Sequence, residues 1–413
     1  MFYKKENMIE AFSLTLYLIF LLKHKIKKRV ITTLSHLVFF NCVFFLFVFG
    51  GSTWNIIESS YMLAPFALSF IINTQVILAL LLRNKGGGGV LLSSFLPPFV
   101  FSIWNFNLII PAHPLMIFYQ FDFFYKILPR FDNNIINIII IYIIPFIFLL
   151  QIRKLIIVLI IMGLCFFINW NLVEQKKMGV KILVVQTDMF LSKHKKIANL
   201  KEEIFKYDDA DIIIFSESPA IGFKEGSRTV FTRDFIDEIK TKKDGKLYIL
   251  NNYGFVNGEQ YNYNLSLYIM NGSIHIKAKR KLVPFWETPS LFYRKNDWKS
   301  PYFSVPSETM SEKYKFRNIY INSYICYEGL FANTISIVND LTIIQSNYES
   351  FSKGYDRVVK NGNVLAYVNK SSGFKNFISV QNMGGTIFVD NKGKFHWNVY
   401  ETSKKKAIFL LEI

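Results

Sequence analysis

The sequence has 413 residues, 51% of them hydrophobic and 17% aromatic, which is too apolar for a single water-soluble domain of this length. Its net charge of +18 does not indicate nucleic-acid binding, because the lysines are scattered and form no arginine-rich cluster or recognition motif. Three cysteines argue against a disulfide framework, and the six histidines show no paired spacing that would suggest a metal site. No cofactor is expected. We expect instead a membrane portion, whose anionic lipid head groups suit the positive charge.

Six apolar stretches follow one another in the first part of the sequence, where charge is sparse. They run roughly over residues 9–22, 30–50, 61–82, 90–110, 135–150 and 155–170. Several approach the roughly 20 residues that a helix needs to cross a bilayer, although the first has only about fourteen. We therefore predict a multi-span transmembrane domain of about five or six helices over residues 1–175.

Basic residues between these stretches predict an orientation, because short basic loops stay on the cytoplasmic side. Lysine and arginine cluster in 23–29, 83–85 and 153–154, whereas the alternate loops, 51–60 and 111–134, carry little basic charge. The polypeptide then leaves its last membrane segment on the opposite side. We predict a multi-pass membrane protein whose second domain lies outside the cytoplasm.

Short β-rich runs alternate with helical runs in this second domain, residues 176–413. Such alternation is typical of an α/β domain with mixed sheets. The expected strands are 180–186, 212–216, 247–251, 265–270, 274–277, 319–326, 341–345, 377–380, 386–390 and 407–412. The expected helices are 195–207, 234–243, 330–338 and 356–367.

Three polar residues each follow an apolar, strand-like run: Glu217, Lys279 and Cys326. Strand ends are where α/β folds gather side chains from distant positions. A thiol is a nucleophile only as thiolate, so it needs a base, for which Glu217 is suited, and a cation, for which Lys279 is suited. The same ammonium is able to stabilise the oxyanion formed when the thiolate attacks an acyl carbonyl. Taken singly, each residue has a plainer interpretation, as a buried small hydrophobe or a surface charge.

The strings around these residues resemble those of the carbon–nitrogen hydrolase (nitrilase) superfamily, whose catalytic order is also Glu, Lys, Cys. The most specific pair is Leu282-Val283-Pro284-Phe285 with Glu287, and Ile325-Cys326-Tyr327-Glu328. Further matches are Val185-Gln186, Phe215-Ser216-Glu217-Ser218 and Tyr263-Asn264. The layout of the whole sequence is similar to the bacterial apolipoprotein N-acyltransferase family. This resemblance implies a multi-span α-helical membrane domain followed by a periplasmic nitrilase-like domain, an α-β-β-α sandwich.

The resemblance also implies roles and partners. Glu217 would be the general base, Lys279 the oxyanion stabiliser and Cys326 the acylated nucleophile. Four more residues would support the site: Glu287, Glu328, Tyr327 and Asn264. In this family a phospholipid donates an acyl chain to the thiol, and the amino group of a lipoprotein's diacylglyceryl-cysteine then takes it as an amide. The implied partners are the membrane, a phospholipid and diacylglyceryl lipoproteins, on the periplasmic side of a bacterial inner membrane.

Departures from the family pattern fall on loops expected around the pocket. Residues 189–193 lack the tryptophan of the family's mobile loop, and residues 346–351 and 366–372 replace two further motifs. These differences leave other interpretations open. One is an amidase or a transferase with another acceptor, and another is a nitrilase-like scaffold without catalysis.

Overall fold

The computed structural model describes most of the second domain and a helical segment that precedes it. The described residues are 12–17, 19, 35, 38–39, 42–43, 110–121, 123–131, 133–147, 160, 163–164, 178–194, 197–217, 235–254, 263–283, 287, 303–305, 313–333, 339–348, 355–371 and 375–413. The predicted boundary between residues 175 and 176 lies outside them and stays a prediction.

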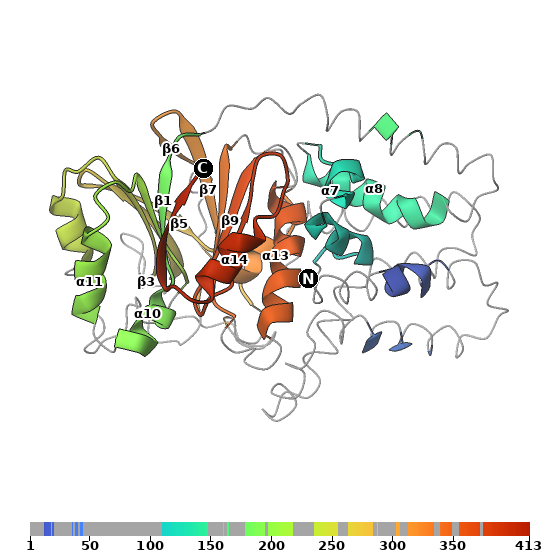
Figure 1. Cartoon of the computed structure of the whole chain (residues 1–413), viewed down its shortest axis with the longest axis horizontal. Coiled ribbons are helices and arrows are strands. Elements are labelled where there is room, and N and C mark those ends of the chain that lie inside the picture. Colours follow the sequence, from blue (N-terminus) through green and yellow to red (C-terminus); the bar gives the residue numbers. More distant parts are fainter. Residues whose placement is uncertain are drawn as a thin grey trace.

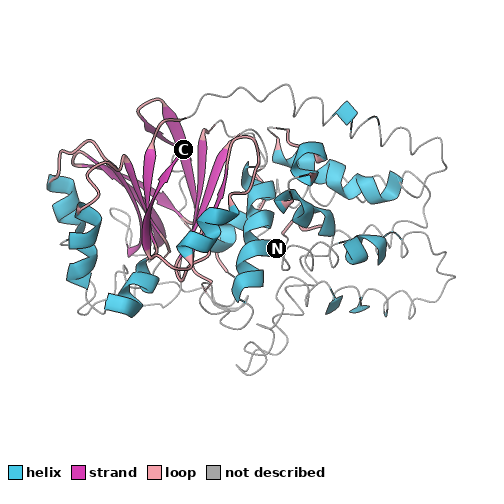
Figure 2. Ribbon diagram, viewed as in Figure 1, coloured by secondary structure: helices cyan, strands magenta, loops and turns pink. Residues whose placement is uncertain are grey.

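Two mixed β-sheets form the centre of the molecule (Figure 2). The strands are β1 (Lys181–Val185), β2 (Ile212–Phe215), β3 (Leu247–Gly254), β4 (Tyr263–Met270), β5 (Ser273–Ala278), β6 (Tyr314–Phe316), β7 (Ile319–Ile325), β8 (Leu341–Ser346), β9 (Asn376–Gln381), β10 (Ile387–Val389) and β11 (Ile408–Glu412). The first sheet has the order β11-β1-β2-β3-β4-β5, and the second β10-β9-β8-β7-β6. The central strands β1, β2 and β3 are parallel, as are β7, β8 and β9. In each sheet, the carboxyl ends of these strands therefore lie at one edge.

Apolar side chains fill the space between the two sheets. Ile182 and Ile212 of the first sheet belong to one buried cluster with Ile343 and Ile378 of the second. The neighbouring Leu183 belongs instead to the cluster on the outer face of the first sheet. Because side chains alternate along a strand, a central strand of this sandwich is buried on both faces. This explains why the sequence shows continuous apolar runs rather than alternation.

Helices cover the outer faces of both sheets (Figure 1). On the first sheet they are α10 (Thr187–His194), α11 (Ile197–Phe205) and the helical residues 235–241. On the second sheet they are α13 (Tyr355–Ser371) and α14 (Trp397–Ser403). The layers thus follow one another as helix, sheet, sheet and helix. The α-β-β-α sandwich predicted for this part of the chain is confirmed.

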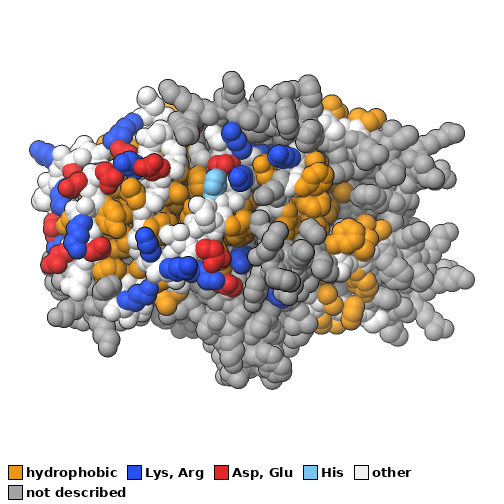
Figure 3. All heavy atoms as spheres, in the orientation of Figure 1, with side chains coloured by type: hydrophobic (Ala, Val, Ile, Leu, Met, Phe, Trp, Pro, Cys, Tyr) orange, Lys and Arg blue, Asp and Glu red, His pale blue; other side chains and the backbone are white. Residues whose placement is uncertain are grey.

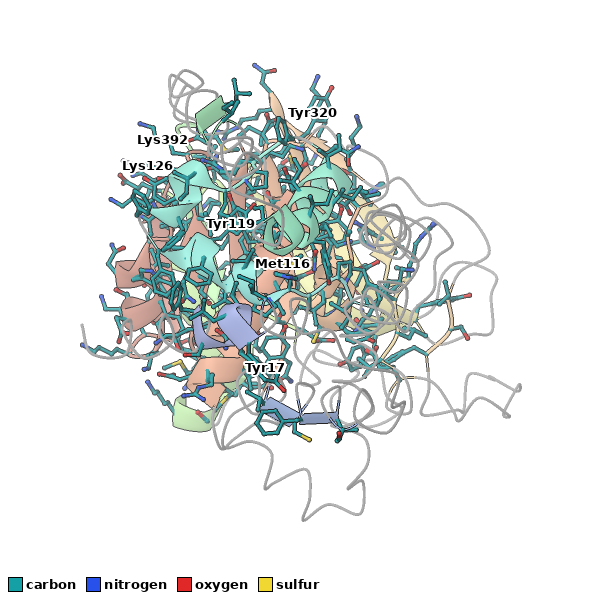
Figure 4. All side chains as sticks on the ribbon, turned by 90° about the vertical axis from the view of Figure 1, so that its right-hand side faces the viewer. Tyr17, Met116, Tyr119, Lys126, Tyr320 and Lys392 are labelled. Carbon is teal, nitrogen blue, oxygen red and sulfur yellow. The ribbon has the colours of Figure 1, made fainter. Side chains whose placement is uncertain are left out.

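A further helical layer lies against α13, on the side away from the sheets (Figure 1). It consists of η3 (Pro114–Gln120), α7 (Phe124–Ile127) and α8 (Asn134–Ile147). Met116 and Tyr119 of η3 are fully buried in the same apolar cluster as the residues of α13, and both lie centrally in the view onto this layer (Figure 4). We call this segment, residues 110–147, the third helical layer.

Polar side chains also attach the third helical layer to the sandwich. Asn134 Nδ2 donates a hydrogen bond to the carbonyl of Val368 in α13 at 2.9 Å. Arg130 is buried, and its guanidinium donates to the carbonyls of Asn391 and Lys392. These two carbonyls belong to the turn after β10. The layer is therefore held by directional bonds as well as by apolar packing.

The prediction of a multi-span membrane domain is wrong, and with it the predicted inner-membrane location. Among the residues that the structure describes, no helix is both long enough and apolar enough to cross a bilayer. Helix α8 falls on the predicted segment 135–150 and has 14 residues, against the roughly 20 that a crossing needs. Its side chains Ile138 and Ile141 are buried within the protein, a situation that hydropathy alone does not distinguish from burial in lipid. The other predicted segments lie wholly or partly outside the described residues.

All ten strands expected from the sequence are present, although their ends differ by up to three residues. Strand β6 was not expected, because three residues are too few to show a period. Three of the expected helices correspond to α11, to residues 235–241 and to α13. The fourth, 330–338, lies mostly outside the described residues. Helices α10 and α14 were not expected, and both are short.

The surface differs between the two parts of the molecule. In the face shown in Figure 3, charged side chains of both signs are intermixed over the sandwich, whereas apolar side chains gather over the third helical layer. Phe123 and Ile136 are among the exposed apolar residues of that layer. The mixed charge is typical of a face that meets water.

Arg130→Ala should lower the free energy of unfolding by roughly 1–3 kcal/mol, because two carbonyls of the 391–393 turn lose a buried, charged donor. Urea denaturation followed by circular dichroism measures the loss. Arg317→Ala is the control: Arg317 is 56% exposed in its ion pair with Asp211 and should contribute at most about 1 kcal/mol. Equal losses in both variants would contradict the anchoring role of Arg130.

Candidate active site

Three strand ends meet where the two sheets face each other. Glu217 stands two residues after β2, Lys279 directly after β5 and Cys326 directly after β7. Strands β2 and β5 belong to the first sheet and β7 to the second. The Glu217 carboxylate and the Cys326 thiol lie close enough for each to shift the pKa of the other, and the Lys279 ammonium interacts electrostatically with both groups. The structure therefore brings together the three residues singled out in the sequence.

Cys326 lies at a sharp turn from β7 into the 3-10 helix η5 (Cys326–Leu330). Its φ is +48°, in the left-handed region that costs an L-residue with a Cβ roughly 1–2 kcal/mol. The side chain is partly exposed, and Sγ lies 3.9 Å from the carbonyl oxygen of Asn347. A strained backbone that presents a reactive group points to a functional position.

The Lys279 ammonium is buried between two carboxylates. The residue is 1% exposed, and its Nζ donates to Glu287 Oε1 at 2.8 Å. The distance from Nζ to Glu217 Oε1 is longer, 3.9 Å. The backbone N–H of Val283 donates to the other oxygen of Glu287 at 2.7 Å. Glu287 is therefore the close counter-ion that a buried charge requires, and Glu217 keeps the looser contact.

Two asparagines of the first sheet orient the carboxylates. Asn264 Nδ2 donates to Glu217 Oε1 at 3.0 Å and to Glu287 Oε1 at 3.3 Å. Its Oδ1 accepts from Asn251 Nδ2 at 2.7 Å, which leaves the Asn264 amide with one orientation. Because N–H donors favour the ionised form of a carboxyl group, Asn264 acts to lower the pKa of Glu217.

Glu328 links the ends of β5 and β7. Its Oε1 accepts from the backbone N–H of Arg280 at 3.2 Å, and its Oε2 accepts from that of Ile325 at 3.3 Å. Arg280 directly follows Lys279, and Ile325 directly precedes Cys326. This buried carboxylate thus connects the first sheet to the second at the site.

Burial and neighbouring charges shift the pKa of all three groups. Burial raises the pKa of Glu217 above its ordinary value of 4.5; the Lys279 ammonium opposes this shift, and Glu287 adds to it. Burial also raises the pKa of the Cys326 thiol, and Glu217 adds to that shift. For Lys279 burial acts downward, but the carboxylates of Glu287 and Glu217 outweigh it and raise the pKa. These shifts favour the protonated thiol of Cys326 and the charged ammonium of Lys279.

Some residues around the site did not stand out in the sequence. Ser216 Oγ donates to Asn382 Oδ1 at 2.9 Å, which holds the residue before Glu217 from the second sheet. Asn251 lies within β3 and Asn382 directly follows β9. A polar residue at such a position was the only sign in the sequence that these two asparagines belong to the site. Tyr327 was expected to shape the site; it is buried in an apolar cluster, with its ring edge-on to a neighbouring phenylalanine.

Parts of the expected motifs lie outside the described residues, namely Ser218, Pro284 and Phe285. Within the described ranges, no group of three or more His, Cys, Asp or Glu side chains is placed to hold a metal ion. The site is therefore described by its carboxylates, its ammonium and its thiol.

No family model matches the sequence, and no curated protein matches it. Solved structures are similar to it. The glutamine-dependent NAD+ synthetase from Acinetobacter baumannii is 15% identical, with 57% of this chain and 45% of that protein covered and a TM-score of 0.38. Nit3 from Saccharomyces cerevisiae, of branch 10 of the nitrilase superfamily, is 13% identical. The match covers 54% of this chain and 87% of Nit3, with a TM-score of 0.35. The CN-hydrolase superfamily protein XC1258 from Xanthomonas campestris is 14% identical. The match covers 57% of this chain and 90% of XC1258, with a TM-score of 0.38.

Structures similar to this chain thus include members of the carbon–nitrogen hydrolase (nitrilase) superfamily. The chain spans less than half the length of the NAD+ synthetase. One fold carries many activities, and the residues of the site decide the chemistry. The resemblance of the sequence strings to the apolipoprotein N-acyltransferase family stays a prediction.

We expect the rate at which iodoacetamide alkylates Cys326 to rise with pH through a midpoint above 4.5, because only the ionised Glu217 carboxylate accepts the thiol proton. Glu217→Gln should remove this rise. It should leave only the alkylation at high pH that follows from direct ionisation of the thiol, whose pKa is raised. Mass spectrometry of the Cys326 peptide after timed alkylation gives the rate without interference from other cysteines. Identical profiles for both proteins would contradict the role of Glu217 as base.

Proposed function

We propose that the protein is a cysteine-dependent enzyme of the carbon–nitrogen hydrolase type, which transfers acyl groups through a thioester on Cys326. The observation that carries the proposal is the buried Lys279 ammonium, which is held against Glu287 and Glu217 and interacts electrostatically with the Cys326 thiol. Buried ion pairs contribute little net stability and are often replaceable by apolar residues. A reactive role explains their presence here better than a structural one.

In the first half-reaction, Glu217 takes the proton of Cys326 while Sγ attacks the carbonyl carbon of the acyl donor. The electron pair of the C=O double bond moves to oxygen, where the Lys279 ammonium stabilises the negative charge. When the tetrahedral intermediate collapses, the bond to the leaving group breaks, and Glu217 gives that group its proton. The acyl chain is then held as a thioester.

In the second half-reaction, an amine, an alcohol or water attacks the thioester carbonyl while Glu217 takes its proton. The same ammonium stabilises the second oxyanion. Collapse of this intermediate breaks the C–S bond, and Glu217 returns the proton to the departing sulfur of Cys326. The product is an amide, an ester or a free acid, and the site returns to its resting state.

The more specific version of the proposal has a phospholipid as the acyl donor and the amino group of a diacylglyceryl-cysteine lipoprotein as the acceptor. It is supported by the strings 282–287 and 325–328, which resemble the apolipoprotein N-acyltransferase family. The alternative is an amidase, in which water is the acceptor. It is favoured by residues 189–193, 346–351 and 366–372, which depart from the strings of the acyltransferase family.

Protein incubated with a phospholipid carrying a radiolabelled acyl chain should form a covalent adduct of acyl mass that neutral hydroxylamine removes. Cys326→Ala should form none, because no other group in the described site is placed to make a thioester with Glu217 as its base. Intact-protein mass spectrometry and label retention measure the adduct. A hydroxylamine-sensitive adduct that persists in Cys326→Ala would refute the proposal.

The acceptor is identified in the same assay by adding a peptide with an N-terminal diacylglyceryl-cysteine. Transfer to the amine raises the mass of the peptide by one fatty acyl group, whereas hydrolysis of the thioester by water releases the free acid and leaves the peptide unchanged. Formation of the adduct without either product would show that the natural acceptor is a different molecule.

Lys279→Met should lower kcat by about 10²- to 10³-fold, because the oxyanion loses its charged donor. Lys277→Met is a matched control on the same strand: Lys277 is also buried, but its ammonium donates to Asn322 and to the carbonyl of Ser323. It should change kcat much less. Steady-state rates of acyl transfer, with circular dichroism to verify folding, provide the comparison. Similar losses in both variants would assign the effect to folding rather than to the oxyanion.

A further inference from the structure

A network of buried hydrogen bonds crosses the otherwise apolar space between the sheets. Tyr268 OH donates to Ser323 Oγ at 2.6 Å, Ser323 Oγ donates to Ser266 Oγ at 2.8 Å, and Ser266 Oγ donates to Gln345 Oε1 at 2.7 Å. Gln345 Nε2 then donates to the carbonyl oxygen of Phe215 at 2.8 Å. The four side chains are at most 1% exposed. We call them, with the Phe215 carbonyl, the inter-sheet network.

The inter-sheet network ends next to the reacting groups on both sheets. Phe215 is the last residue of β2 and stands two residues before Glu217. Gln345 lies on β8 directly opposite Ile325, the residue before Cys326. Gln345 therefore connects two strands next to the site. One is β2, which precedes Glu217, and the other is β8, which pairs with β7, the strand that precedes Cys326.

We propose that Gln345 is a positioning residue, which sets the distance between the Glu217 carboxylate and the Cys326 thiol by holding β2 against β8. The inference rests on the proposed function, in which Glu217 takes the thiol proton. Apolar packing between sheets is non-directional. A hydrogen bond has a preferred length and angle, so the amide fixes how the two sheets lie relative to each other at this end of the sandwich.

The amide of Gln345 has a defined orientation. Its oxygen accepts from the hydroxyl of Ser266, and its nitrogen donates to the carbonyl of Phe215. An isosteric methionine keeps the apolar packing but removes these two bonds, and a longer one to the carbonyl of Ile249 at 3.5 Å, and leaves buried polar groups without this partner. Strand β2 then loses its hydrogen bond to β8. A displacement of about 1 Å in a reacting group lowers a rate by as much as about 10²-fold.

The experiment measures the pH profile of Cys326 alkylation in Gln345→Met. We expect the rate above the midpoint to fall by roughly 10- to 100-fold. The midpoint should rise, because the interaction with Cys326 lowers the pKa of Glu217 and weakens when the two groups move apart. A residue that only stabilises the fold would not move this midpoint.

Gln345→Glu is the conservative variant. While its buried carboxyl group stays protonated, it is able to accept from Ser266 and donate to Phe215, so it should recover most of the lost rate. Once that carboxyl ionises, the donor is lost and the rate should fall. If Gln345→Met does not fold, the decrease in alkylation rate on ionisation of the carboxyl group in Gln345→Glu is by itself the test of the positioning role.

Gln120→Met is the matched control. Gln120 is also buried, and its Nε2 donates to the carbonyl of Ile117 at 3.0 Å, within η3 and outside the sandwich. Both methionine variants should lower the urea midpoint, but only Gln345→Met should change the alkylation profile. An unchanged profile in folded Gln345→Met overturns the positioning role. A wild-type profile that does not depend on Glu217 shows instead that the proposed function is wrong.

Discussion

The buried ammonium of Lys279 is the group on which the rest of the site depends. Removing such a charge from water costs several kcal/mol even after the protein relaxes, so it must be paired with good geometry. Glu287 supplies the close contact and Glu217 the longer one, and Asn264 donates to both carboxylates. These groups come from different strands and from the segment after β5. The ammonium is therefore stable only when the first sheet is completely formed.

The nucleophile comes from the opposite sheet, so the site also depends on how the two sheets are packed. Several polar contacts cross between them near the site, among them the hydrogen bond from Ser216 to Asn382. Glu328 joins the backbone after Lys279 to the backbone before Cys326, and Gln345 joins β8 to the end of β2. Fully satisfied buried polar contacts of this kind favour one arrangement over others that apolar packing alone would allow.

The sequence was sufficient to predict ten of the described strands and to place Glu217, Lys279 and Cys326 at strand ends, because continuous apolar runs followed by a polar residue are a local signal. It was not sufficient for the partners of Gln345 and Asn251, since these bonds depend on which strands lie opposite each other. It was misleading for α8, which was expected to cross a bilayer, whereas its side chains Ile138 and Ile141 are buried within the protein. Hydropathy reports that a side chain avoids water, but it does not report what covers that side chain.

The backbone of Cys326 shows what the reactive position requires of the fold. Glycine adopts a φ of +48° without strain, whereas a cysteine holds it against roughly 1–2 kcal/mol. Selection for folding alone would place glycine at the end of β7. Stability and the proposed role as nucleophile thus favour different residues at position 326, and the residue found there is the one that the proposed role favours.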